Sequence, residues 1–144
     1  MSKLYKKYVL LKINNPQKIY LFECGIFYIF IDEDAKLMSK ILNLKLTLLN
    51  SVIFKCGFPV NSINKYLQIL KNSNYNIEIV PSDNFSSPIS INNFAISKKI
   101  EKIIYDFLKH DINSLSISQA FDLLNDLQIK FRKIIGEKDN EEKK

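Results

Sequence analysis

One stretch constrains the fold more than any other: CGIFYIFIDEDAK, at residues 24–36, is an apolar run that stops at three acids. Both alternating sets of side chains from residue 26 to residue 31 are apolar, which predicts a strand whose second face is buried against a partner or the terminal helices. The acids from Asp32 to Asp34 favour the start of a helix, because free backbone amides and the helix dipole stabilise carboxylates there. A strand that leads directly into a helix indicates an α/β fold.

The same alternation of strands and helices extends over the first 80 residues. Helices are expected before Asn14, after Asp32 and after Asn61 or Ser62. At 144 residues and 47% apolar content, the chain can bury one core. We therefore predict an α/β domain at residues 1–80, a small mixed β-sheet flanked by helices. Its strands are expected at Ile19–Cys24, Phe27–Ile31, Leu44–Leu48, Val52–Phe58 and Ile77–Val80.

The composition changes after Val80. The segment PSDNFSSPISINN predicts a linker or irregular loop over residues 81–96, in which Ile89 and Ile91 could add a short edge strand. Two amphipathic helices follow, and the second opens with a capping box formed by Ser116 and Gln119. We expect a C-terminal helical hairpin at residues 97–136, ending at Gly136, and a disordered tail at residues 137–144.

The positive charge lies in the first part of the chain. The net charge is +6, and the first 80 residues hold eleven lysines against five acids, whereas the remainder is balanced. Such a field attracts polyanions, so nucleic acid is a reasonable partner, although a general abundance of lysine explains the charge equally well. No run approaches the roughly 20 apolar residues that span a bilayer. We expect a cytoplasmic protein with no membrane contact and two reduced thiols, Cys24 and Cys56.

Residues typical of catalysis are scarce. The three glycines, Gly25, Gly57 and Gly136, are too far apart for a phosphate-binding loop. The single histidine, His110, excludes a metal site built on a histidine pair, and the acids at 32–34 are explained by the helix start. We expect no catalytic residue, no cofactor and no metal, and therefore not an enzyme.

Residues 24–36 resemble the G-D-F-Y-E-x-F-x-x-D-A-K signature of the mismatch-recognition domain in the MutS family of DNA mismatch-repair proteins. The likeness extends upstream from Tyr8 to Phe22 and downstream through FKCGFP at 54–59, covering roughly residues 5–80. A second resemblance, to the extreme C-terminus of MutS, runs from Asp111 to Phe131. The chain is thus similar to the two ends of MutS, and the family implies a MutS domain I-like fold.

The resemblance gives Phe27 the position of the aromatic wedge that stacks on a mispaired base. Ile29 and Ile26 stand where the family has Glu and Asp, so the polar partner of the base is lost. Losing one such hydrogen bond forfeits about 1.5 to 3 kcal/mol, enough to weaken discrimination between bases. Whether Phe27 is exposed or belongs to the core stays open at this point.

Two sets of site residues follow, together with two functions. The first function is a non-catalytic accessory protein that acts with a reverse transcriptase and its RNA or cDNA in a diversity-generating retroelement. The alternative is a stand-alone module that binds mismatched or distorted DNA. A homo-oligomer formed through the C-terminal helices is also expected. The expected nucleic-acid contacts are Phe27, Tyr28, Lys3, Lys6, Lys7 and Lys12, and the expected partner surface is Ala120, Leu124, Leu127 and Phe131.

Overall fold

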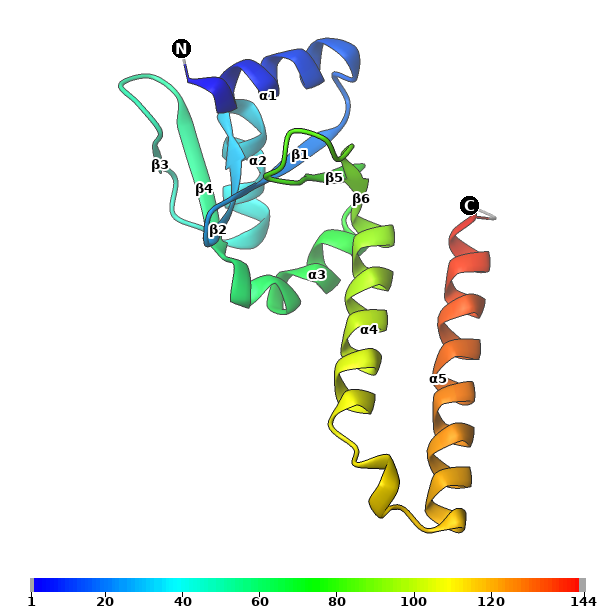
Figure 1. Ribbon diagram of the computed structural model, residues 1–144. Helices are drawn as coiled ribbons and strands as arrows, with labels where there is room; N and C mark the ends of the chain where they lie inside the picture. The colour runs from blue at the N-terminus through cyan, green and yellow to red at the C-terminus, as the bar shows by residue number, and fades with distance from the viewer. Residues whose placement is uncertain (1, 143–144) are drawn as a thin grey trace. The chain divides into compact units, whose positions relative to one another are not determined.

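The computed structural model describes residues 2–142, and Figure 1 shows its elements in chain order. The chain divides into two compact units, a first one up to Ile91 and a second one from Asn92 on. Each unit is described by itself below.

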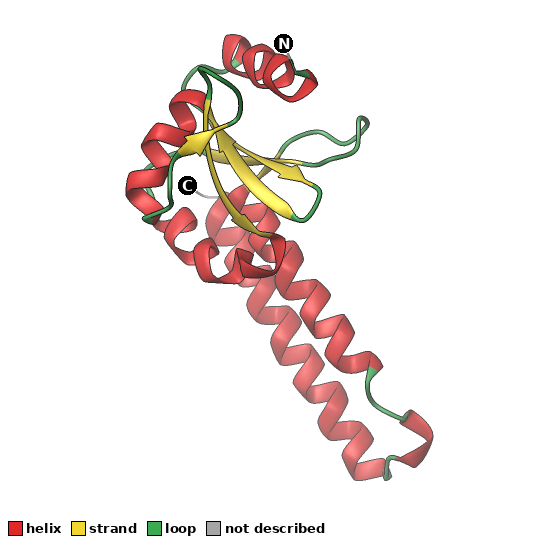
Figure 2. Cartoon of the chain, turned by 90° about the vertical axis from the view of Figure 1, so that its left-hand side faces the viewer, coloured by secondary structure: helices red, strands yellow, loops and turns green. Residues whose placement is uncertain are grey.

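The first unit is built on one mixed sheet, drawn in yellow in Figure 2. Within the described residues the sheet has six strands in the order β3-β4-β2-β1-β5-β6. The pair β1 and β5 is parallel and all other neighbours are antiparallel, which confirms the predicted α/β fold with a small mixed sheet. The strands are β1 Ile19–Cys24, β2 Phe27–Ile31, β3 Thr47–Leu48, β4 Phe54–Pro59, β5 Ile77–Val80 and β6 Ile89–Ser90.

One face of the sheet is covered by α2 (Asp32–Leu42) and α3 (Ile63–Asn72), and is called the α2–α3 face below. Helix α2 begins at Asp32, directly after β2, as the acids predict. The Sγ atom of Cys56 donates a hydrogen bond to the backbone oxygen of Ala35. The ring of Phe58 stacks on Tyr66, with 4.2 Å between ring centroids. The α2–α3 face therefore forms a closed apolar layer.

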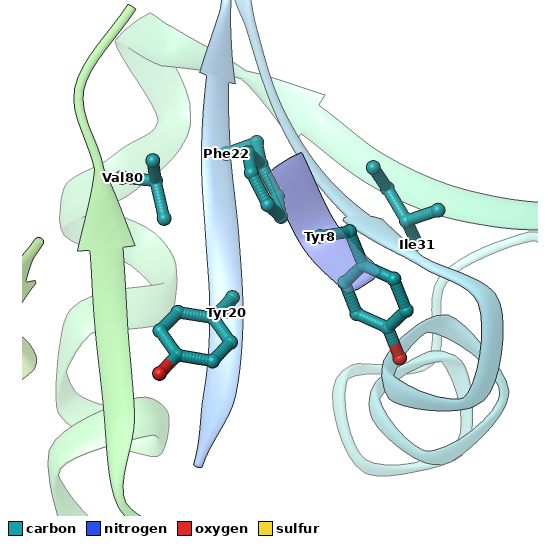
Figure 3. Close-up of a cluster of buried hydrophobic side chains, with 5 residues drawn as sticks. All are labelled: Tyr8, Tyr20, Phe22, Ile31 and Val80. Carbon is teal, nitrogen blue, oxygen red and sulfur yellow. The ribbon is translucent and has the colours of Figure 1, made fainter. Parts of the chain in front are cut away.

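The opposite face, called the α1 face, is covered by α1 (Lys3–Asn14). Figure 3 shows the buried cluster beneath this helix, in which Tyr8 lies close to Phe22 and Ile31. The rings of Tyr8 and Phe22 are 6.4 Å apart between centroids. One short helix covers only part of a six-stranded sheet, so the rest of the α1 face is left without a helix.

A buried carboxylate holds α1 in place. Asp34, in the first turn of α2, is only 2% exposed. It accepts a hydrogen bond from the backbone N–H of Tyr20 at 3.0 Å and an ion pair from the Nζ atom of Lys12 at 2.9 Å. Burial raises the pKa of Asp34, although both hydrogen bonds act in the opposite direction. Asp34 thus connects α1, β1 and α2, a role beyond the helix start that the sequence indicates.

The second unit contains α4 (Ile91–Leu108), a 3-10 turn at Ile112–Ser114 and α5 (Ile117–Glu142). The two long helices run antiparallel, joined by an ion pair of 2.6 Å between Lys99 and Glu137. The expected capping box is confirmed, because the side chains of Ser116 and Gln119 each accept the other's backbone N–H.

Several element boundaries differ from the sequence prediction. Helix α4 begins at Ile91, inside the expected linker, and α5 continues through Gly136 instead of ending there. A glycine inside a helix costs only about 1 kcal/mol, which the remaining turns offset. The suggested edge strand is confirmed at Ile89 as β6, whereas Ile91 begins α4. No helix in the described part of the chain is long and apolar enough to cross a membrane.

Candidate nucleic-acid interface

Strand β2 directs alternate side chains to the two faces of the sheet. Tyr28 and Phe30 point to the α2–α3 face and are 2% and 0% exposed. Phe27 and Ile29 point to the α1 face, where Phe27 keeps 44% of its surface exposed. The second apolar face of the strand is therefore uncovered at Phe27 within this unit. The sequence left open whether Phe27 is exposed or belongs to the core, and the structure shows that its ring is exposed.

A cavity of about 490 Å³ lies on the α1 face beside Phe27. The cavity exists because α1 covers this face of the sheet only as far as Leu4. Gly57 of β4 lies opposite Ile29 and has no side chain to fill the base of the cavity. A Cβ atom at Gly57 would collide with the backbone oxygen of Tyr28 and the side chain of Ile29, so only glycine fits. The walls are formed by Leu4, Cys24, Phe27, Ile29, Lys45, Thr47, Leu49, Lys55, Cys56 and Gly57.

A second cavity, of about 340 Å³, adjoins the first, because Leu4 and Cys24 line both. It lies where the first turn of α1 faces the turn between β1 and β2 and the loop after β5. Gly25 forms that β-turn with a positive φ of 58°, which glycine adopts without strain. The other wall residues are Lys3, Lys7, Phe22, Glu23, Pro81, Ser82 and Asn84.

The two adjoining cavities carry four lysines. Lys45 and Lys55 line the first, and Lys3 and Lys7 line the second. None of the four forms an ion pair with another described residue. Glu23 is the acid in these walls, so the lysines outnumber it. The combination of free ammonium groups, an apolar floor and an exposed ring suits a polyanion that carries flat, apolar faces.

Three predicted contacts are placed elsewhere. Tyr28 lies in the core with its ring 5.9 Å from that of Phe58, so its ring does not share a surface with Phe27. Lys12 is held by the buried Asp34 and by the backbone oxygen of Lys18. Lys6 is exposed on α1 but lines neither cavity. We therefore retain Phe27, Lys3 and Lys7 for the interface.

Sequence reasoning missed Lys45 and Lys55. They stand ten positions apart, and pairing of Thr47 with Lys55 across β3 and β4 brings this part of the chain together. The alternation of Lys55, Gly57 and Pro59 on β4, all on one face, is the signal that could have indicated the second lysine.

The two cysteines beside the cavity are free thiols. Burial raises the pKa of Cys24, and the nearby charge of Lys55 lowers it in part. Burial alone raises the pKa of Cys56 to about 12. Both thiols therefore stay protonated at neutral pH and are weak nucleophiles. No group of three or more metal-ligating side chains occurs within residues 2–142.

The expected partner surface in the second unit is divided between two sides of α5. Ala120 and Leu127 are half-buried and share a helix face with the buried Ile134, at a spacing of seven residues. Leu124 is 60% exposed and Phe131 36% exposed. Of the four expected residues, Leu124 and Phe131 are therefore the exposed ones.

A mixed sheet with one closed face and one partly open, basic face defines a small domain of the α/β class. The chain belongs to the MutS domain I family, which it matches over residues 2–104. This match extends past residue 80, where the resemblance in the sequence was expected to end.

Individual relatives agree with this assignment. The DNA mismatch repair protein MutS of Leptospira interrogans is 30% identical over 101 residues, which is 70% of this chain and 12% of that protein. MutS of Thermotoga petrophila is 34% identical over 79 residues, 55% of this chain and 10% of that protein. The DNA mismatch repair protein Msh3 of Dictyostelium discoideum is 30% identical over 77 residues, 54% of this chain and 5% of that protein. The chain thus spans about a tenth of the length of the MutS relatives that it matches.

Proposed function

We propose that this domain is a non-catalytic DNA-binding module that recognises mispaired or otherwise distorted duplexes. The observation that carries the proposal is Phe27, an aromatic ring that is 44% exposed at the wall of a basic cavity. Membership of the MutS domain I family supports it, as do relatives that are named DNA mismatch repair proteins. A free energy gained by stacking on Phe27 offsets the cost of opening the duplex most easily where base pairing is already weak.

The position of Phe27 suits a wedge. Strand β2 is paired on both sides, with β1 and with β4, so the ring stands on a rigid element and not on a loop. Its neighbours in the cavity are mainly apolar, including Ile29 and Leu49. A base seated there would be held by stacking and not by a side-chain hydrogen bond. We therefore expect a preference for distorted sites with little discrimination among the four bases.

The first test compares a fluorescein-labelled duplex containing one unpaired thymine with the fully paired duplex, by fluorescence anisotropy. We expect the unmodified chain to prefer the unpaired site and Phe27→Ala to bind it about five- to a hundredfold more weakly. Tyr75→Ala is the matched control. It removes an aromatic ring that is 42% exposed just before β5, at the end of that strand far from the cavity. Equal affinities for Phe27→Ala and the unmodified chain would contradict the proposal.

The same titration repeated over a range of salt concentrations tests the lysines. Replacing Lys45 and Lys55 by glutamine should make the slope of log K against log salt less negative by about 0.9 for each lysine that contacts a duplex phosphate. Replacing Lys65 and Lys71 on α3 removes the same charge on the other face of the sheet. An identical slope for both double variants would show that lysines on either face contribute equally, and that no one surface binds the phosphates.

The more specific role beside a reverse transcriptase and its RNA in a diversity-generating retroelement stays a prediction from the resemblance alone, as does a cytoplasmic location. Self-association through Leu124 and Phe131 is likewise a proposal. Co-purification with a polymerase encoded by a neighbouring gene tests the first, and light scattering of the isolated chain tests the last.

A further inference from the structure

The loop between β5 and β6 presents a second aromatic ring to solvent. Phe85 is 97% exposed, the largest exposed fraction among the large apolar side chains described. The proposed function does not use it. Exposing a whole phenylalanine ring forgoes the free energy that its burial would gain, about 1.5 to 3 kcal/mol. The ring is therefore accessible to a ligand.

The loop that carries Phe85 is ordered by Asp83. The Oδ1 atom of Asp83 accepts hydrogen bonds from the backbone N–H groups of Phe85 and Ser86, at 2.9 and 2.5 Å. Its Oδ2 atom accepts a third from the hydroxyl of Ser86 at 2.9 Å. These bonds lower the pKa of Asp83, with a smaller contribution from the charge of Lys7. The result is a turn closed by an aspartate side chain, which fixes the backbone at the aromatic residue.

This turn stands at the far end of the candidate interface. Pro81, Ser82 and Asn84 of the same loop line the second cavity together with Lys3 and Lys7. That cavity adjoins the first, whose wall includes Phe27. The first unit therefore carries one exposed aromatic ring in the wall of the first cavity and another on the loop that lines the second, and both walls contain lysines. Glu23 and Asp83 are the acids at the Phe85 end, and they limit how closely a phosphate can approach there.

We infer that Phe85 is a second base-stacking residue and that the path from Phe27 across Leu4 and Cys24 to the turn at 83–86 binds a single-stranded segment of nucleic acid. The inference rests on the proposed function, since it takes Phe27 as the first stacking residue. A single strand fits because its bases are free to stack on aromatic rings while its phosphates follow lysines. A closed duplex offers neither ring a base face, except where it is opened.

The test measures binding of a fluorescein-labelled oligothymidine by anisotropy, with the whole chain and its variants. Phe85→Ala should bind about five- to a hundredfold more weakly, Phe85→Trp should bind as well as the unmodified chain, and Tyr75→Ala should be unchanged. Phe85→Leu should be as weak as Phe85→Ala, because leucine retains an apolar surface but has no ring. Full binding by Phe85→Leu would overturn stacking, because an apolar side chain without a ring would then be enough to bind the strand. Unchanged binding by Phe85→Ala would overturn the inference outright.

A pair of substitutions at Asp83 tests the turn itself. Asp83→Asn and Asp83→Ala remove the same charge, but only asparagine keeps a side-chain oxygen that can accept from the backbone N–H groups of Phe85 and Ser86. Asp83→Ala should therefore bind oligothymidine more weakly than Asp83→Asn. Equal binding by the two variants would show that the ordered turn contributes nothing.

Failure of the inference differs from failure of the proposed function. If Phe27→Ala weakens binding to the duplex with an unpaired thymine while Phe85→Ala leaves oligothymidine binding intact, only the inference fails. If the unmodified chain binds neither probe, both fail. An RNA oligomer of uridine run beside oligothymidine reports which sugar the surface prefers, and weaker binding of Phe85→Ala to either probe supports the inference.

Discussion

The two faces of the sheet in the first unit carry similar residues, but helices cover one face more completely than the other. On the α2–α3 face, two helices bury Tyr28, Phe30 and Phe58 to 2% exposure or less. On the α1 face, one helix buries Tyr20 and Phe22 but leaves Phe27 uncovered. The hydrophobic effect alone would cover both. The difference indicates that the first face serves stability and the uncovered part of the second is free to serve binding.

The sharpest test of this comparison uses two neighbouring aromatics on β2. Tyr28→Ala should lower the free energy of unfolding by about 3 to 5 kcal/mol, because it leaves a cavity beneath Phe58. Phe27→Ala should lower it by about 1 kcal/mol or less, since the ring is already half exposed. Urea unfolding followed by circular dichroism measures both. Similar losses for the two variants would mean that the faces do not differ in the way proposed.

The next test concerns the contact through which Asp34 holds α1 against the sheet. Asp34→Ala should lower the free energy of unfolding by about 3 kcal/mol, because Lys12 and the backbone N–H of Tyr20 lose their buried partner. Glu33→Ala is the control. It removes the exposed carboxylate one residue earlier, whose pair with Lys36 lies in solvent, so the free energy of unfolding should change little.

Urea unfolding of these two variants gives the comparison directly. If Asp34→Ala were no less stable than Glu33→Ala, α1 would be held by apolar contacts such as Tyr8 against Phe22. The Asp34 contact would then be dispensable, and the limit of the α1 face would be set by packing alone.

The comparison of the two faces also shows which parts of the structure could be predicted from the sequence. Strands and helices could be predicted because each has its own period and its own end signals. The exposure of Phe27 could not, because both alternating sets in residues 26–31 are apolar and the pattern does not distinguish inside from outside. That distinction depends on the short length of α1, which covers only part of the sheet.

Charged residues show the same limit. Lys12 follows the pattern of a solvent-facing lysine on a basic helix, and only the fold brings it to Asp34, 22 positions away. Lys45 and Lys55 line the same cavity only because β3 pairs with β4. Contacts of this kind depend on long-range pairing, which no local pattern encodes. The turn at Asp83 is local, and its Asp and Ser three positions apart could have been noticed.

The smallest expected effect is a pH dependence of stability from Asp34. Burial raises its pKa in the folded chain above the ordinary value, so the folded chain binds the proton more tightly than the unfolded chain. As the pH rises from the ordinary pKa of an aspartate through the raised one, the unfolded chain loses its proton first, and the free energy of unfolding falls. Above that window the contribution of Asp34 stays constant.

Asp34→Asn should remove this component, because asparagine does not titrate but still accepts the N–H of Tyr20. The measurement is the free energy of unfolding in urea over a series of pH values, taken as the difference between the unmodified chain and Asp34→Asn. That difference should decrease as the pH rises through the window. An increase instead would mean that the ion pair with Lys12 outweighs burial. The ionised form of Asp34 would then stabilise the folded chain, and the contrast between the two faces would extend to their electrostatics.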